Sequence, residues 1–210
     1  MNTGLLIVLS GFSGAGKGTV VKRLLEKYSG QYALSISATT RQPREGEKEG
    51  VSYFYKTEEE FQKMIADGEF IEYAQYVKNS YGTPRSYVEQ KLSEGKNVIL
   101  EIELQGALKV KEKLPDALML FVMPPTAEEL KNRLVGRGTE DMETIEARLS
   151  RASEEAESIQ YYDYLIINDD LEECVDDIHA LISSEHNKVS RNEEKIKKMK
   201  EELRQFRKEN

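Results

Sequence analysis

Short apolar runs of strand length alternate along most of the chain with longer segments whose apolar residues recur at helical spacing. The runs lie at residues 5–10, 32–37, 97–103, 117–123 and 164–167. The helical patterns lie at residues 17–28, 86–94, 105–113, 126–135, 143–160 and 171–184. Strands that alternate with helices in this way are typical of an open parallel sheet covered by helices on both faces. The sequence therefore predicts an α/β core, which binds its ligands at the carboxyl ends of the strands.

Two stretches interrupt this alternation. Residues 39–83 are rich in Gly, Tyr and charge, and alternating segments at 51–55 and 70–76 flank a helical pattern at 58–67. They predict a small mixed α+β insertion at residues 37–85, carried by a core made of residues 1–36 and 86–184. The second stretch, at residues 136–141, combines two Gly with acidic residues between helices, and it predicts a mobile lid at about 136–148.

The last 26 residues, 185–210, differ in composition from the rest. They carry nine Lys or Arg against six Glu, so their net charge is +3 while that of the remaining chain is -11. Six residues here are separated alternately by three and four positions, which would align them as one apolar seam on a helix, with a polar break at Asn192. They are Val189, Asn192, Ile196, Met199, Leu203 and Phe206. This charged tail could be a solvated or frayed helix laid on the core, or it could join two copies in a homo-oligomer.

Composition narrows the class of protein. The chain has 210 residues, of which 39% are hydrophobic and 32% charged, so it is too apolar for general disorder. Its longest apolar run, residues 117–123, is far shorter than the ~20 residues that span a bilayer, so we expect no membrane partner. A net charge of -8 argues against general affinity for nucleic acid, so residues that bind phosphate must cluster locally.

Cysteine and histidine are scarce. The single Cys174 cannot form an internal disulfide, and with only two His a Cys/His zinc site is not credible, so any metal must be held by oxygen. The apolar residues 5–9 are too few, and lack the basic flank, for an export signal. We therefore expect a cytoplasmic protein.

A Gly-rich segment with one Lys joins the first predicted strand to the first predicted helix. It consists of Gly11, Phe12, Ser13, Gly14, Ala15, Gly16, Lys17, Gly18 and Thr19. In this pattern, G-x-x-x-x-G-K, successive backbone N–H groups and the helix N-terminus face phosphate oxygens, and the Lys reaches the β- and γ-phosphates. Gly18 stands where Ser or Thr usually holds Mg²⁺, so the metal ligand is either Thr19 or water.

A phosphate loop alone is compatible with ATPases, GTPases and small-molecule kinases. The Asn-Lys-x-Asp motif with which GTPases recognise guanine does not occur in the sequence, and a helicase-type motor needs a much longer chain. The remaining candidate is a compact kinase whose second substrate binds to the insertion.

The insertion carries residues suited to a phosphorylated purine. Arg41 and Arg44 lie three residues apart, so their guanidinium groups could converge on one anion, although loop arginines often pair with a neighbouring Glu instead. Tyr53 and Tyr81 add phenolic donors. Glu72 lies in the apolar segment 70–74, where burial of a carboxylate is costly unless the group has a hydrogen-bonding partner.

Guanine is a suitable partner for such a carboxylate. Its N1–H and N2–H₂ donors can be accepted together by one carboxylate, and its O6 can accept from the hydroxyl of Ser37 or Thr83. Glu101 and Glu103, at the end of the third core strand, are further candidates. Adenine reverses the pattern of donors and acceptors, and a site built to hydrogen-bond one partner rejects a mismatched one by roughly 10⁴–10⁵.

Taken together, these segments resemble the guanylate kinase family. The resemblance rests on residues 11–19, 37–46, 50–55, 70–72, 81–83, 101–106, 133–139, 148–149 and 168–169, which span nearly all of the chain before the tail. It implies the fold of a P-loop nucleoside monophosphate kinase and ATP-dependent phosphorylation of GMP, with dGMP as a further acceptor. It also implies Mg²⁺ bound with ATP.

The resemblance also assigns roles to single residues. The GMP phosphate is held by Arg41, Arg44, Tyr53 and Tyr81, and guanine is read by Ser37, Glu72, Thr83 and Glu103, with Gly82 in the same segment. Arg137 and Arg148 close on the ATP phosphates, and Asn168 meets the adenine. The expected catalytic set is Lys17, Arg41, Arg44, Arg137 and Arg148.

The sequence departs from the family pattern at two of these positions. Phe12 replaces a Pro that is common in the loop, and Glu103 stands where Asp is common. Two alternatives remain: a guanylate-kinase-like scaffold that binds peptides, and a kinase for another phosphorylated acceptor. The intact Lys17 argues against the first, and Glu72 with Thr83 argues against the second.

Overall fold

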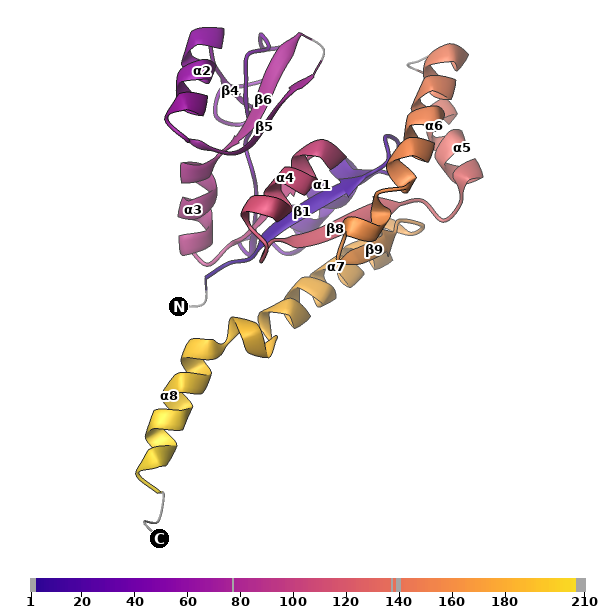
Figure 1. Ribbon diagram of the computed structural model, residues 1–210. Coiled ribbons are helices and arrows are strands. Elements are labelled where there is room, and N and C mark those ends of the chain that lie inside the picture. The colour runs from indigo at the N-terminus through magenta and orange to yellow at the C-terminus, as the bar shows by residue number, and fades with distance from the viewer. Residues whose placement is uncertain (1–2, 77, 137, 139–140, 207–210) are drawn as a thin grey trace.

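The computed structural model describes residues 3–76, 78–136, 138 and 141–206 (Figure 1). Its core is a sheet of five parallel strands in the order β2-β7-β1-β8-β9. These strands are β1 (Leu6–Gly11), β2 (Tyr32–Leu34), β7 (Asn97–Glu101), β8 (Leu118–Met123) and β9 (Tyr164–Ile167). Each of them falls within one of the apolar runs or overlaps most of it, so the predicted parallel core is confirmed.

Helices cover both faces of this sheet, and β1 shows why. Ile7 and Leu9 on one face pack with residues of α1 and α7, whereas Val8 on the other face packs with residues of α3 and α4. Strands buried on both faces read as continuous apolar runs, as these do. The helices of the core are α1 (Lys17–Lys27), α3 (Arg85–Ser93), α4 (Leu104–Lys113), α5 (Ala127–Gly136), α6 (Met142–Ala156) and α7 (Leu171–His186), with a 3₁₀ turn, η1, at Ile159–Tyr161.

The insertion forms a second sheet, of mixed direction, in the order β4-β3-β6-β5. It comprises β3 (Ala38–Thr39), β4 (Phe54–Tyr55), α2 (Glu58–Ala66), β5 (Phe70–Tyr76) and β6 (Asn79–Pro84). A small core of its own, formed by Ala38, Phe61 and Phe70, holds α2 against the sheet. The strands β3 and β6 were not expected from the sequence, because neither shows an apolar alternation.

On the other side of the core from the insertion stands the helix pair α5 and α6 (Figure 1). The predicted lid at about 136–148 falls at their junction, and its second half belongs to α6, which begins at Met142. The carboxylate of Asp141 caps this helix by accepting from the Thr144 N–H at 2.8 Å. Arg137, one of the residues assigned to ATP, lies outside the described residues.

The tail is not one helix. α7 continues to His186, a 3₁₀ turn, η2, follows at Val189–Arg191, and α8 (Glu193–Arg204) then projects away from the body (Figure 1). The side-chain amide of Asn192 accounts for the break, since it donates to the carbonyl oxygens of His186 (2.8 Å) and Lys188 (2.9 Å). The seam is therefore divided, and only Ile196, Met199 and Leu203 lie on one helix, since α8 ends at Arg204 before Phe206. Within the described residues, no helix is long and apolar enough to cross a membrane.

Candidate active site

The loop between β1 and α1 requires glycine at two of its positions. A Cβ on Gly11 would lie 2.0 Å from the carbonyl oxygen of Val122 on the neighbouring strand. Gly16 has a φ of 89°, and a Cβ there would lie 2.6 Å from the side-chain nitrogen of Asn168. The loop is thus pressed against the sheet, and it turns sharply into the helix N-terminus in a way that only glycine permits.

Lys17 lies across this loop rather than pointing away from it. Its Nζ donates to the carbonyl oxygens of Gly11 (2.6 Å) and Phe12 (3.2 Å). Phe12 is buried, and its ring meets Phe121 edge-on with centroids 5.0 Å apart. The residue that replaces the family's common Pro therefore anchors the loop through packing, and the lysine ammonium is held at the mouth of the loop.

Two side chains from distant parts of the chain also meet the loop. Arg148 on α6 donates from Nη1 to the hydroxyl of Ser13 at 2.5 Å. Asn168, which directly follows β9, is buried and donates from Nδ2 to the carbonyl oxygen of Ala15 at 2.8 Å. Arg148 thus lies at the phosphate loop, and its role toward the ATP phosphates stays a prediction. The role of Asn168 toward adenine stays a prediction, and its amide here supports the loop backbone.

Oxygen ligands at the end of the loop are few. Thr19 is exposed in the first turn of α1, and Glu101 at the end of β7 brings a carboxylate oxygen to 3.8 Å from where a Cβ on Gly18 would stand. No group of three or more His, Cys, Asp or Glu side chains suited to a metal occurs among the described residues. A metal here would therefore keep most of its ligands from water or from a bound nucleotide.

Arg41 of the insertion is held by a carboxylate that the sequence did not single out. Its Nη2 lies 2.8 Å from Oε1 of Glu47, and its Nη1 donates to the carbonyl oxygen of Gln42 at 2.8 Å. The other oxygen of Glu47 accepts from the Arg44 N–H and from the Tyr55 hydroxyl, both at 2.8 Å. These donors, Arg41 foremost, lower the pKa of Glu47 to about 2, so it is ionised throughout the physiological range.

Tyrosine rings complete this cluster. The guanidinium carbon of Arg41 lies 5.2 Å from the ring centroid of Tyr53, and the Tyr53 and Tyr81 rings lie 6.1 Å apart. Arg44 is exposed, and its backbone N–H bonds to Glu47. The structure therefore brings Arg41, Tyr53 and Tyr81 together, with Arg41 oriented in advance by Glu47 and a ring face, and their binding of the GMP phosphate stays a prediction.

Glu72 on β5 is 5% exposed, and its Oε1 accepts from the Thr83 hydroxyl at 2.7 Å. Its Oε2 packs against α4, where a Cβ on Gly106 would stand 3.0 Å from it. Burial raises the pKa of this carboxyl, while Thr83, Lys109 and then Lys113 act in the opposite direction. A desolvated carboxylate with one neighbouring hydroxyl is a strong acceptor for a ligand that brings its own N–H donors.

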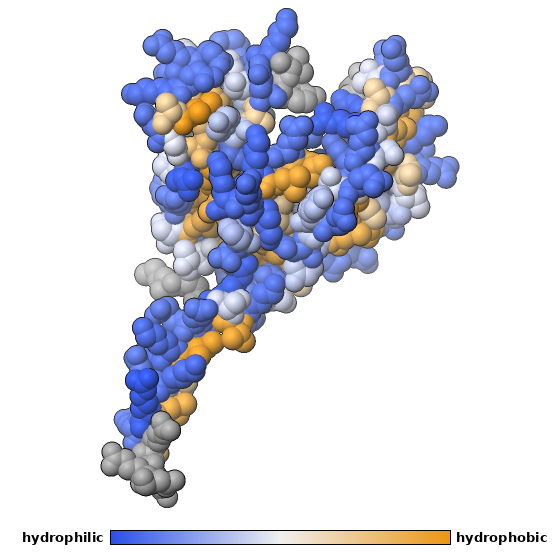
Figure 2. Space-filling model, in the orientation of Figure 1, coloured by the Kyte–Doolittle hydropathy of each residue, from blue (hydrophilic) through white to orange (hydrophobic). Residues whose placement is uncertain are grey.

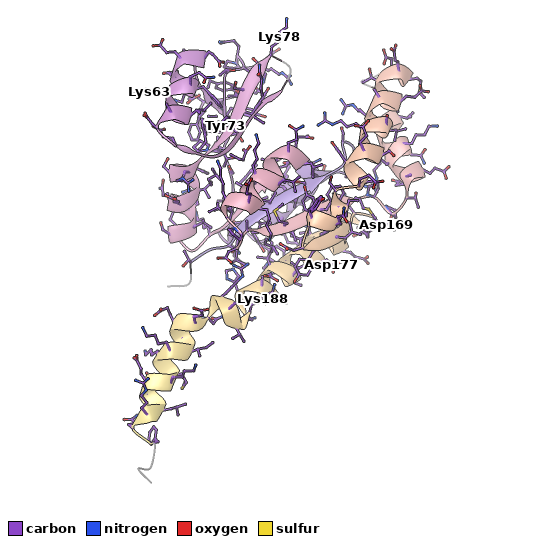
Figure 3. The ribbon with its side chains drawn as sticks, viewed as in Figure 1. Lys63, Tyr73, Lys78, Asp169, Asp177 and Lys188 are labelled. Atoms are coloured by element: carbon purple, nitrogen blue, oxygen red, sulfur yellow. The ribbon has the colours of Figure 1, made fainter. Side chains whose placement is uncertain are left out.

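Two lysines of α4 fix this part of the insertion to the core. Lys109 donates to the carbonyl oxygen of Tyr73 at 3.0 Å, and Lys113 donates to that of Ile71 at 2.9 Å. These carbonyls flank Glu72 on either side, and Figure 3 shows Tyr73 on the side of the insertion that faces the core. The carboxylate is thus held at the junction of the two units.

The other residues assigned to guanine, Glu103 and Ser37, are less buried than Glu72. Glu103 precedes α4, its side chain is 65% exposed, and it pairs at 3.3 Å with Arg151 of α6. Ser37 is half-buried just before β3. Arg151 was not anticipated, although it stands one helical turn after Arg148 and the two share the face of α6 that meets the core.

The phosphate loop and the insertion cluster are candidates for the two halves of one site. The space-filling view shows the molecule hollowed between the insertion and the α5–α6 pair, above the core (Figure 2). In each half, cations and N–H donors gather around a space where anions would bind, and the insertion half adds a buried carboxylate. The arrangement suits two phosphorylated molecules placed end to end.

Comparisons with known proteins agree with this geometry. A family model described as guanylate kinase matches residues 3–185. A curated guanylate kinase from Oceanobacillus iheyensis is 54% identical over 173 residues, which cover 82% of this chain and 84% of the relative. The crystal structure of guanylate kinase from Anaplasma phagocytophilum superposes with a TM-score of 0.71 at 36% identity, covering 90% of each chain. The chain therefore belongs to the guanylate kinase family, the nucleoside monophosphate kinases that phosphorylate GMP to GDP with ATP.

Proposed function

We propose that this chain binds ATP on the phosphate loop and GMP on the insertion, and that a GMP phosphate oxygen attacks the γ-phosphorus of ATP in line. The bond from that phosphorus to the ADP oxygen breaks as the new bond forms, giving ADP and GDP. The attacking oxygen is already anionic, so no general base is required. What remains is to position two polyanions and to offset their charge.

On the donor side, the loop N–H groups from Gly11 to Thr19 and the N-terminus of α1 cradle the ATP phosphates. Lys17 exchanges its two carbonyl contacts for phosphate oxygens when ATP enters. Arg148 supplies charge from α6, and Arg137 is assigned the same role by the family resemblance. Closure of the insertion and the lid then excludes water, which would otherwise hydrolyse ATP.

On the acceptor side, Arg41, Arg44, Tyr53 and Tyr81 bind the GMP phosphate. The guanine assignment is carried by one observation, the buried pairing of Glu72 with Thr83. The Glu72 carboxylate accepts from N1–H and N2–H₂ of guanine, and the hydroxyl of Ser37 or Thr83 donates to O6. Glu103 and Ser37 complete the contacts only if the insertion closes, because both lie at its border with the core.

The residues at the loop fit Mg²⁺, which prefers hard oxygen ligands and keeps several waters. Thr19 and Glu101 are the side chains that would hold it, directly or through water, next to the nucleotide phosphates. Bound there, Mg²⁺ supplies positive charge that offsets the charge of the transferring phosphoryl group. A cytoplasmic location is in keeping with ATP as the donor.

We further propose that dGMP is an acceptor, because no site residue is assigned to the ribose 2′-hydroxyl. The test is to measure phosphoryl transfer from Mg·ATP to GMP, dGMP, AMP, UMP and CMP. Turnover is expected with the two guanine nucleotides, and kcat/KM for AMP is expected to be lower by at least about 10³-fold. Comparable rates with AMP or UMP would contradict the guanine assignment, and no turnover with any acceptor would favour the binding scaffold.

Glu47→Gln tests whether Glu47 orients Arg41 for the GMP phosphate. The amide keeps the shape of the side chain but loses the ion pair, so we expect the KM for GMP to rise by about 3- to 10-fold, since a screened ion pair contributes only modestly. The KM for ATP is expected to stay unchanged. Glu45→Gln, which removes the same charge from an exposed position of the same loop, is the control. Equal effects of the two substitutions would show that only the net charge of the loop matters.

A further inference from the structure

The tail presents an apolar face that nothing in the body covers. None of the residues of α8 is buried, and Met199, Leu203 and Phe206 are 54%, 55% and 74% exposed. Figure 2 shows apolar side chains in a line along the projecting helix. An isolated helix of about 12 residues is marginal in water, so α8 needs packing from elsewhere to be stable.

The root of the tail holds α8 away from the body. Arg191 donates to the carbonyl oxygen of Asp116 at 3.0 Å and lies 3.5 Å from the buried Glu185. Glu185 also accepts from the Tyr164 hydroxyl at 2.8 Å and pairs with Lys188 at 2.6 Å. Figure 3 shows Lys188 at this junction. These contacts fix the segment that leads into α8, and since no residue of α8 is buried, its apolar face is available to another molecule.

We propose that this face binds the same face of a second copy of the chain, with the two α8 helices antiparallel. The apolar residues Ile196, Met199 and Leu203 follow the spacing of a coiled-coil seam. Charged residues line both sides of it: Glu193 and Lys200 on one side, and Lys195 and Glu202 on the other. The pattern of these charges selects both the partner and the register.

In one antiparallel register, Ile196 of each copy faces Met199 of the other. Glu193 then lies beside Lys200 of the second copy, and Lys195 lies beside Glu202. The two-fold axis repeats each pair, so four flanking pairs all join opposite charges. The same register brings Leu203 and Phe206 of each copy toward the turn of the other that carries Val189, which is 74% exposed.

The neighbouring arrangements place like charges together. A parallel pair in register sets Lys195 beside Lys200 of the other copy, twice. If one antiparallel helix is shifted by one layer along the other, Lys200 lies beside Lys200 of the second copy and Glu202 beside Glu202. A shift in the opposite direction places Glu193 beside Glu193 and Lys195 beside Lys195. An anionic lipid surface is also disfavoured as a partner, because Glu193 and Glu202 beside the seam would repel it. The charges therefore favour a second copy, in a single register.

The test is sedimentation velocity of the full chain over a range of concentrations. The wild-type chain is expected to dimerise. Lys200→Glu places like charges at two symmetric positions and is expected to raise the dimer Kd by about tenfold, and adding Glu193→Lys in the same chain is expected to restore it. Lys197→Glu, which makes the same charge change on the solvent side of α8, is the control and is expected to leave the Kd unchanged.

Three outcomes would overturn the proposal. They are a wild-type chain that stays monomeric at all concentrations, a dimer equally sensitive to Lys197→Glu and Lys200→Glu, and a double variant that fails to recover. Phosphoryl transfer to GMP and circular dichroism serve as folding controls, because these residues lie far from the proposed active site. Dimerisation is independent of the kinase assignment, so failure of either one leaves the other standing.

Discussion

Replacing Lys17 with Ala is expected to lower the rate of phosphoryl transfer by about 10³-fold, the largest effect of any single substitution in this chain. The ammonium is held at the mouth of the loop by the carbonyl oxygens of Gly11 and Phe12. From there it can reach the β- and γ-phosphates without rebuilding the loop. Its charge matters most when negative charge shifts onto the bridging oxygen, so we expect kcat to fall far more than the affinity for ATP changes.

The measurement is steady-state kinetics with each substrate varied in turn. The KM for GMP is expected to stay within about twofold, because Lys17 belongs to the donor half of the site. Lys22→Ala, on the exposed side of the same helix, controls for loss of positive charge near the loop and is expected to retain full activity. A Lys17→Ala variant that keeps a tenth or more of wild-type turnover would show that the loop amides and the lid arginines suffice.

The core of the fold was predictable because its strands are buried on both faces. Such strands read as unbroken apolar runs, and the helices between them show a clear apolar stripe. β6, by contrast, has the sequence Asn-Ser-Tyr-Gly-Thr-Pro, which shows no alternation and contains three residues that are poor strand formers, Asn, Gly and Pro. Its pairing with β3 and β5 depends on tertiary contacts. One of these is at Gly82, where a Cβ would lie 2.8 Å from the Phe70 ring.

The tail shows a different limit of sequence patterns. Its spacing of three and four residues predicted one seam from Val189 to Phe206, and spacing alone contains no information about a break. The break comes from a side chain, since the Asn192 amide donates to the carbonyl oxygens of His186, the last residue of α7, and of Lys188, and α8 begins directly after Asn192. Asparagine competes with helical backbone hydrogen bonds in this way because its amide is short. A polar residue within an apolar seam is the sequence signal for such a break.

The site was predictable in its residue types but not in its internal contacts. Motifs gave Lys17, Arg41 and Glu72, because phosphate and guanine require those chemistries. They could not show that Glu47 binds Arg41, since five residues of loop separate the two and the neighbouring Glu residues are equally plausible partners. The presence of several acidic residues after Arg44 was the only signal, and it did not distinguish among them.

Glu72→Ala is expected to raise the KM for GMP by about 10²-fold while leaving the KM for ATP within about twofold. Two hydrogen bonds from guanine to an ionised, desolvated acceptor are lost together, and each such bond is worth about 1.5–3 kcal/mol. The control is Glu69→Ala, an exposed carboxylate just before the same strand. Unaltered GMP affinity in Glu72→Ala would refute the guanine assignment.

Glu72→Gln distinguishes the role of Glu72 in guanine recognition from its effect on the stability of the fold. Burial raises the pKa of Glu72, so the free energy of folding contributed by this group is fully present below the pKa of the unfolded chain and is lost as the pH rises through the folded pKa. At pH 7 the ionised carboxylate is therefore a cost to the ligand-free protein. We expect the neutral Glu72→Gln variant to have a thermal midpoint equal to or above that of the wild type, while its KM for GMP is still raised at least about tenfold. A lower midpoint together with weak GMP binding would point to structural damage instead.

The same raised pKa sets how GMP binding depends on pH. Guanine donates to the ionised carboxylate, so wild-type affinity should fall as the pH drops toward the pKa of Glu72, starting above the pH at which an ordinary Glu would protonate. The GMP phosphate also gains a proton near pH ~6, and this change affects the wild type and Glu72→Gln alike. The ratio of GMP affinities between the wild type and Glu72→Gln cancels the shared titration. A ratio that shrinks in mildly acidic buffer assigns the remaining pH dependence to the carboxylate, whereas a constant ratio would mean that Glu72 does not contact guanine in its ionised form.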